Sequence, residues 1–462
     1  MTINGLDRKK NLSESETLEA LVPSVPRLSE DWELVRAFLE IKKACAQANC
    51  TVGNLTQSKR DAIVAACDAL LNVGKAKELQ TEKNAPLNAI ATRIDQLILS
   101  KVEGFDRGEL DLCQSFNDVL LSAQSIAIYR HATLALTEVR ALEDALEEKA
   151  VSFAAATRCG RIGQRDSVPM TFGQVIAGWK ASVMRARKHI EMLLPELLEL
   201  VLGGTVLGTG LGASLEYRKA AYDALTTITK LAVVPAKEES AITDSAFFGL
   251  YQSHGRLLAL MGAVKELGYA VGKIANDLYV FSSGPRTGYR EFTLPAIAPG
   301  SSIMPGKLNP LMPELVLQVM QQVFANDTEL SLLSNDLSLD ADTFASDAYA
   351  SVAESLTLLK GAMHQFTALC VKGLGINAEF CAARAKESLA LSHVVEMLFG
   401  AETEKQVREK AIQTGKRIEV ICVEEKLLSE KDAIELFSPL SLADVKTSAQ
   451  LLAAFKTQYS KD

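Results

Sequence analysis

Apolar residues recur at every third or fourth position along most of the chain, a spacing that places them on one face of a helix. Before residue 104 this pattern predicts helices over 31–48, 57–71 and 87–102. Residues 104–111 are rich in charge and glycine, and they interrupt the pattern. The first residues are polar and lead to Pro23 and Pro26, so we expect a loose arm that becomes ordered against a partner.

Longer periodic segments follow Cys113, at 120–149, 171–199, 214–232, 240–282, 310–336 and 342–370. Long helices joined by short breaks predict a helical bundle. Shorter segments end the chain at 379–400, 403–427 and 429–462, and no alternating pattern supports a sheet of any size. The sequence thus predicts an all-α protein with an N-terminal helical domain (1–112), a central helical-bundle domain (113–370) and a small C-terminal helical domain (371–462).

Composition and charge narrow the class of protein. Hydrophobic residues make up 48% of the 462 residues and aromatic residues only 6%, a balance that favours closely packed helices. A net charge of −8 without a basic stripe argues against a nucleic-acid partner, and no apolar run is long enough for a membrane span. The eight cysteines are scattered without a C-x-x-C pair, so we expect reduced thiols, no metal and a cytoplasmic location.

The stretch from Gly300 to Pro310 carries the clearest chemistry. Its sequence is Gly-Ser-Ser-Ile-Met-Pro-Gly-Lys-Leu-Asn-Pro, which suits a loop and no regular element. Such a loop can present hydroxyl, amine and amide side chains, together with backbone N–H groups, to one small anion.

This stretch resembles the signature loop of the aspartase/fumarase superfamily, Gly-Ser-Ser-x-Met-Pro-x-Lys-x-Asn-Pro. The resemblance extends to the superfamily's second block, at 113–118, and to its third block, at 160–161 and 166–174. It also covers 273–278, 282–286 and 375–379. In the third block, Val168-Pro169-Met170-Thr171 is closer to aspartases than to fumarases. The glycine-rich break at 203–212 mimics a dinucleotide fingerprint, but its flanks are helical and the superfamily has a similar turn there.

The resemblance implies a homotetramer with each active site built from three subunits, acting on a small carboxylate without metal or organic cofactor. The implied reaction is a reversible anti-elimination of an amine or hydroxyl group through an aci-carboxylate dianion. By position, Ser301 corresponds to the catalytic base, and Glu314 to a supporting carboxylate. The substrate-binding positions that the resemblance implies are Ser302, Lys307, Asn309, Asn117, Ser115 and Asn88.

The other blocks depart from the superfamily pattern. Ile162-Gly163 stands where fumarases carry Thr-His and aspartases Thr-Gln, and Phe116 replaces a serine or threonine. The superfamily's first block, Ser-Gly-Thr-x-x-Asn-Met-Asn, is best placed at 83–90, where only Asn88 is kept. The five histidines lie in predicted helices, and none adjoins a matched motif except His254, which falls near a superfamily position. Histidines on helical faces are more often packing or surface groups, so none is the candidate acid.

Two explanations follow from these departures. In one, the lyase keeps the proton-abstracting half of its site and rebuilds the other half for a less polar or larger group. Phe116, Ile162 and Leu120 then form an apolar wall, and Lys83, Arg161 or Arg165 meets a remaining anionic group. In the other, the fold persists for assembly or regulation without catalysis.

A buried polar loop without a task carries a desolvation cost, which favours an active enzyme. The aspartase-like third block favours cleavage of a C–N bond in an aspartate-like or N-substituted aspartate-like compound. A C–O lyase or a cycloisomerase acting on another carboxylate remains the alternative within enzymes.

Overall fold

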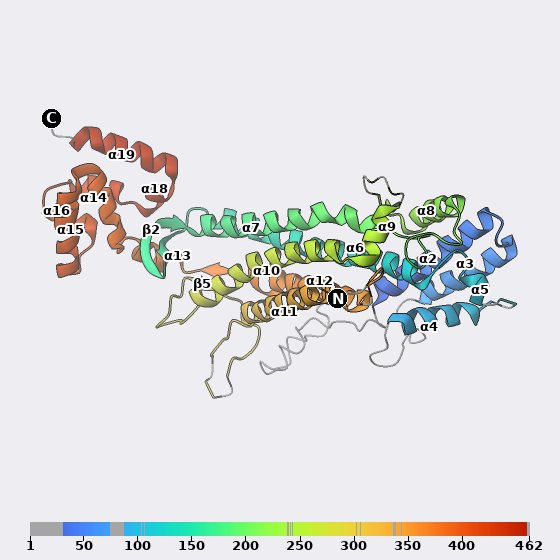
Figure 1. Cartoon of the computed structure of the whole chain (residues 1–462). Helices are drawn as coiled ribbons and strands as arrows, with labels where there is room; N and C mark the ends of the chain where they lie inside the picture. The colour runs from blue at the N-terminus through green and yellow to red at the C-terminus, as the bar shows by residue number, and fades with distance from the viewer. Residues whose placement is uncertain are drawn as a thin grey trace.

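The structure is a computed structural model that describes residues 31–73, 87–102, 104–105, 107–237, 240, 242, 244–301, 303–304, 306–335, 339–342 and 344–459. Long helices lie side by side along one axis, with smaller helical regions at both ends (Figure 1). The predicted all-α class is confirmed. Lys83, a candidate contact for an anionic group, and the arm before residue 31 lie outside the described residues.

At one end lie α2 (Trp32–Thr51), α3 (Gln57–Val73), α4 (Leu87–Leu99) and α5 (Arg107–Leu110). Asp31 begins α2 as its cap, because its carboxylate accepts the N–H groups of Glu33 and Leu34. The same carboxylate contacts His131 Nε2 at 3.0 Å and accepts the hydroxyl of Tyr349 at 2.6 Å. One buried acid therefore joins the N-terminal helices to the bundle.

The bundle consists of α6 (Phe116–Ser152), α7 (Phe172–Leu193), α10 (Gly255–Phe281), α11 (Leu311–Leu333) and α12 (Ala345–Phe366). Each packs on its neighbours, and their inward faces share one apolar core with α2. The 37 residues of α6 correspond to about 55 Å of helix. A single π turn, Thr367–Val371, ends α12.

The predicted helix over 240–282 is two helices, α9 (Ser245–Gln252) and α10. Ser253 is extended between them, with φ −146° and ψ 139°. Its hydroxyl accepts the N–H of Gly255 at 3.1 Å, a local bond that competes with a continuous helix. Nearby lie α8 (Leu215–Thr229), the 3₁₀ turn η3 (Leu194–Leu198) and the short parallel pair β3 (Glu199–Leu200) and β4 (Val234–Pro235).

The other end of the bundle carries a hairpin that the sequence pattern did not predict. β1 (Thr157–Ile162) and β2 (Arg165–Thr171) pair antiparallel, and the tip is Gly163-Gln164. Both tip residues have positive φ, 53° and 62°, as a tight two-residue hairpin turn requires. A second small pair, β5 (Phe292–Thr293) and β6 (Gly375–Ile376), lies beside it. Among the described residues, the strands form only two-stranded sheets.

The last part of the chain folds around a separate apolar core that includes Leu391, Val407, Ile421 and Phe437. Its helices are η5 (Leu389–Leu391), α14 (Ser392–Phe399), α15 (Ala401–Thr414), α16 (Ile418–Glu424), α17 (Glu430–Leu436), α18 (Pro439–Ala443) and α19 (Val445–Tyr459). The preceding α13 (Ala378–Ala385) packs on β1, and its Cys381 belongs to the core of the bundle. The division into three domains at 112 and 370 stays a prediction. None of the described helices combines the length and apolarity needed to cross a lipid bilayer.

Candidate active site

The loop from Gly300 to Asn309 is closed by its own hydrogen bonds. The Gly300 N–H donates to the Lys307 carbonyl at 2.8 Å, and the Lys307 N–H donates to the Met304 carbonyl at 3.2 Å. Asn309 Nδ2 donates to the Gly300 carbonyl at 3.3 Å. A Cβ at position 300 would lie 2.9 Å from the Asn309 nitrogen, so the close approach of the two ends requires glycine.

Within this loop, two backbone groups point at the Ser301 hydroxyl. Ser301 Oγ accepts the N–H of Ile303 at 3.3 Å and the N–H of Met304 at 3.2 Å. Fixed donors of this kind lower the cost of placing negative charge on an oxygen. Lys307 is exposed on the same loop and supplies a positive charge. The two N–H donors can therefore stabilise negative charge on the Ser301 oxygen.

Two further predicted residues follow directly on this loop. The Asn309 carbonyl accepts the N–H of Leu311, which starts α11. Glu314 is half-buried in the first turn of α11. Ser301, Lys307, Asn309 and Glu314 thus belong to one compact segment, whereas Ser302 lies outside the described residues.

The predicted residues of the second block lie at the start of α6. Ser115 caps this helix, since its Oγ accepts the Asn117 N–H at 3.3 Å and its own N–H donates to Asp118 Oδ1 at 2.8 Å. Asn117 Nδ2 donates to the Val206 carbonyl at 2.9 Å. The side chain of Asn88 lies outside the description, although its backbone belongs to α4. The substrate-binding roles of all three stay predictions.

Asp118 fixes this end of α6 to the glycine-rich turn. Its Oδ2 accepts the N–H groups of Gly203 at 2.9 Å and Thr205 at 3.2 Å. The side chain is fully buried, and burial raises its pKa to about 6 in spite of these donors. The sequence match pointed to Asn117, but it gave no sign that the next residue holds the turn.

The raised pKa of Asp118 predicts a pH-dependent stability. Protonation favours the folded state, because the folded pKa of about 6 exceeds the ordinary value of 3.8. The stabilisation, about 3 kcal/mol, is complete below the ordinary pKa and is lost as the pH rises through the folded one. We expect the difference in melting temperature, wild type minus Asp118→Asn, to increase as the pH falls from about 7 to about 5.

Asp223 provides the matched control. It is an exposed aspartate paired with Lys219 at 2.9 Å. Asp223→Asn should keep the pH dependence of the wild type. Melting curves in which Asp118→Asn runs parallel to the wild type across this pH range would contradict the assignment.

Asn117 and the β1–β2 hairpin lie at opposite ends of α6. Asn117 is the second residue of this helix, and β1 begins five residues after its end. Beyond that end, the guanidinium of Arg158 stacks over the Phe281 ring at 4.6 Å. The C-terminal end of α10 therefore lies with the hairpin, about 55 Å along α6 from Asn117.

The signature loop lies toward the hairpin end as well. α11 runs antiparallel to α10, as the ion pair of Lys265 with Asp327 (2.5 Å) and the contact of Ser334 with His254 (3.4 Å) show. The first residue of α11 is consequently near the C-terminal end of α10, and Ser301 precedes it on a closed loop (Figure 1). One chain alone does not bring Ser301 and Asn117 together.

Residues 24–325 match a family model described as lyase. The chain is 30% identical to aspartate ammonia-lyase of Escherichia coli (strain K12), over 90% of this chain and 88% of that relative. The chain belongs to the aspartase/fumarase superfamily. It is also 28% identical to fumarate hydratase class II of Listeria monocytogenes, over 89% of this chain and 91% of the relative. A crystal structure of fumarate lyase:delta crystallin from Brucella melitensis has a TM-score of 0.83 at 29% identity, covering 94% of this chain and 95% of that one.

In this member of the superfamily, the charged side chains of the third block form ion pairs within the protein. Ile162 at the hairpin tip is 77% exposed and offers no polar group. Arg161, considered as an anion contact, pairs instead with Glu291 and Asp166 at 2.7 and 2.6 Å. Glu291 also binds Arg158 at 2.6 Å, so this buried acid anchors both arginines of β1.

The apolar wall expected from the sequence does not form within one chain. Leu120 is buried in the core and does not reach a site. Phe116 is 39% exposed beside Asn117, at the end of α6 opposite to Ile162. In the part of the chain that the structure describes, no group of three or more His, Cys, Asp or Glu residues is arranged to hold a metal ion.

Proposed function

We propose that the chain is a carbon–nitrogen lyase acting on an aspartate-like or N-substituted aspartate-like substrate, with Ser301 as the base. The observation that carries the proposal is the pair of N–H groups, from Ile303 and Met304, on the Ser301 oxygen. These donors support an alkoxide, and Lys307 on the same loop supports an anionic substrate.

The reaction needs a strong base and a stabilised anion. The Ser301 alkoxide takes a proton from the carbon next to a carboxylate, and the electron pair moves into that carboxylate to give an aci-carboxylate dianion. Lys307 and Asn309 stabilise the added charge, the lysine as a cation and the asparagine as a directional donor. The electron pair then forms the C=C bond, and the bond to the leaving group breaks.

The exposed third block favours nitrogen as the leaving atom. An ammonium group departs as a neutral amine and needs no further proton, whereas a leaving hydroxide requires a proton donor. Ile162 and Gly163 offer no such donor. A C–N substrate therefore suits this chain better than a C–O substrate.

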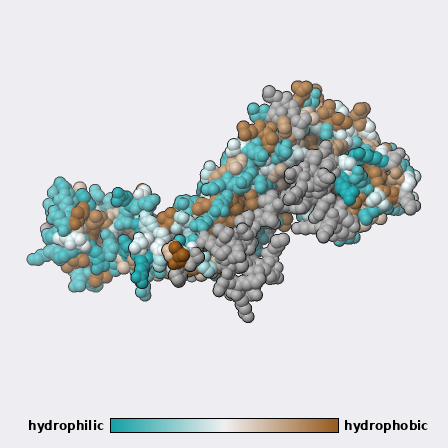
Figure 2. Space-filling model, turned by 90° about the horizontal axis from the view of Figure 1, so that it is seen from below, coloured by the Kyte–Doolittle hydropathy of each residue, from teal (hydrophilic) through white to brown (hydrophobic). Residues whose placement is uncertain are grey.

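A homotetramer with shared sites completes the proposal. Ser301 and Asn117 are separated by the length of the bundle in one chain, so a common site needs a second copy. Ile303 is 84% exposed and Leu308 56% exposed on the loop, as expected of a surface that another subunit covers. Apolar side chains also lie exposed among polar ones over the bundle (Figure 2).

A panel of aspartate, N-substituted aspartates, malate, and fumarate with amines shows whether the enzyme breaks a C–N or a C–O bond. We expect the ultraviolet absorbance of a conjugated product to rise with aspartate or an N-substituted aspartate, and not with malate. Fumarate with amines should show the reverse change. A rise with malate alone would assign the chain to the C–O lyases, and no change over the panel with an intact tetramer would favour a non-catalytic role.

One observation favours a larger or less polar carboxylate as a second candidate. Phe116 lies exposed next to Asn117, where superfamily members carry a hydroxyl, and Val206 at 54% exposure adjoins them. Such an apolar surface accepts an apolar substituent at the expense of a second carboxylate. Turnover restricted to substituted substrates in the panel would support this candidate, and preference for unsubstituted aspartate would exclude it.

A further inference from the structure

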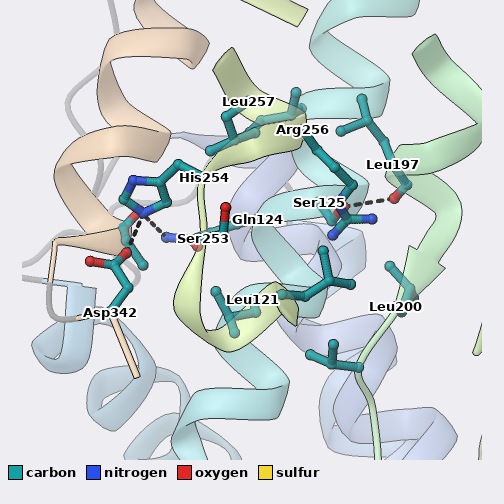
Figure 3. Close-up of a pocket in the computed structure, with 14 residues that line it drawn as sticks. Leu121, Gln124, Ser125, Leu197, Leu200, Ser253, His254, Arg256, Leu257 and Asp342 are labelled. Carbon is teal, nitrogen blue, oxygen red and sulfur yellow. Dashed lines mark hydrogen bonds and ion pairs between the residues drawn. The ribbon is translucent and has the colours of Figure 1, made fainter. Parts of the chain in front are cut away.

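A small cavity lies inside the end of the bundle where α6, η3, β3 and the α9–α10 junction meet. Its volume is about 50 Å³. Leu121, Leu197, Leu200 and Leu257 form an aliphatic wall (Figure 3). Arg256 from α10 reaches between this wall and Ser125. The cavity is therefore lined by aliphatic side chains around one cationic group.

Arg256 is held by carbonyl groups and has no carboxylate partner among the described residues. Its Nη1 donates to the carbonyls of Glu196 and Glu199, the latter at 2.8 Å. Desolvation lowers its pKa, although the nearby charges of Glu199 and Glu196 oppose this effect. Arg256 is half-buried, and a partly desolvated guanidinium is stabilised by an anion that forms paired hydrogen bonds with it.

The acid that also lines the cavity is already paired. Asp342 Oδ2 contacts His254 Nε2, and the Asp342 backbone N–H donates to the Tyr251 carbonyl at 2.8 Å. Figure 3 shows His254 and Asp342 together on one side of the cavity, apart from Arg256. The carboxylates of Glu196 and Glu199 act on the guanidinium only through their nearby charge, and no carboxylate among the described residues forms an ion pair with it.

We propose that this cavity binds a short-chain monocarboxylate of the size of formate or acetate, with its carboxylate on Arg256 and its carbon end against the leucines. A volume of 50 Å³ exceeds the roughly 10–15 Å³ that one water needs and is about a third of the roughly 150 Å³ that takes benzene, so it limits the ligand to a few non-hydrogen atoms. The carboxylate plane fits the guanidinium fork, and the aliphatic wall accepts a methyl group. The first turn of α10 adds a favourable helix dipole.

This site is separate from the signature loop and does not depend on the proposed reaction. Leu121 is one helical turn from Asn117 on α6, at the end of the bundle opposite to Ser301. A ligand here would lie against the segment that presents Asn117. The proposed ligand of the cavity is a small anion, independent of the reaction at the signature loop.

Binding can be measured by saturation-transfer difference NMR with sodium acetate on the full-length protein. We expect a signal from acetate and none from acetamide, its neutral counterpart, and no competition by equimolar chloride. Arg256→Gln should weaken binding about tenfold or more, because a charge-assisted contact is lost. Leu121→Trp should block binding by filling the cavity while keeping Arg256.

A further variant separates this site from the loop. Lys307→Met removes the cation of the signature loop, which is itself proposed to bind a carboxylate, so the acetate binding that persists in this variant reports the cavity. Binding that is lost in Lys307→Met but kept in Arg256→Gln and Leu121→Trp would overturn the proposal. Equal binding of acetamide and acetate would overturn it as well. If Arg256→Gln does not fold, the Leu121→Trp result decides.

Discussion

Turnover of the true substrate is expected to fall by about 10²- to 10⁴-fold when Ser301 is replaced by alanine. Removal of the hydroxyl leaves the N–H groups of Ile303 and Met304 in place but takes away the atom that accepts the proton. The measurement is the initial rate of absorbance change with the substrate found in the panel. Binding should be much less affected, because Lys307 and Asn309 remain.

Ser331 offers a matched control. It is an exposed serine on α11 whose hydroxyl donates to the Asp327 carbonyl at 2.8 Å. Ser331→Ala should keep the wild-type rate. Unchanged turnover in Ser301→Ala would assign proton abstraction to another group.

Mixing two inactive variants is expected to restore activity. Ser301→Ala and Asn117→Ala remove groups from opposite ends of the same chain, and a site shared between subunits can take each missing group from the other variant. After dissociation and random reassembly, about a quarter of the sites should contain both native residues. The rate of the mixture should therefore exceed that of either variant by a large factor.

A pair of substitutions in one loop provides the control. Ser301→Ala and Lys307→Met both damage the segment that Gly300 and Asn309 close, so no reassembled site receives an intact loop. This mixture should stay inactive. Failure of the first mixture, with mixed tetramers demonstrated by mass, would contradict a site shared between subunits.

Much of the helical fold could be predicted from the sequence. The periodic segments at 31–48 and 57–71 became α2 and α3 with ends within a few residues, because their apolar stripes face a core. The break at Ser253 escaped prediction, since apolar spacing continues across it and only a local hydroxyl contact divides the helices. The β1–β2 hairpin escaped too, because only two of the seven β2 residues are buried and its turn depends on the positive φ of Gly163 and Gln164.

The candidate site could be predicted only where it is contiguous in sequence. Ser301, Lys307 and Asn309 lie in one stretch, and the structure keeps them together on a loop closed through Gly300. Contacts between distant segments gave no sequence signal. Examples are Asp118 on the glycine-rich turn and Glu291 between the two arginines of β1.

The most direct test of a C–N lyase with Ser301 as base is the reverse reaction in deuterated water. Fumarate is incubated with ammonium and with small amines, and the products are followed by proton NMR. We predict that the wild type forms aspartate or an N-substituted aspartate with one deuterium on the methylene carbon, which adjoins the carbon that carries nitrogen. Ser301→Ala should form none of this product. Malate as the only product, or the same labelled amino acid from Ser301→Ala at the wild-type rate, would contradict it.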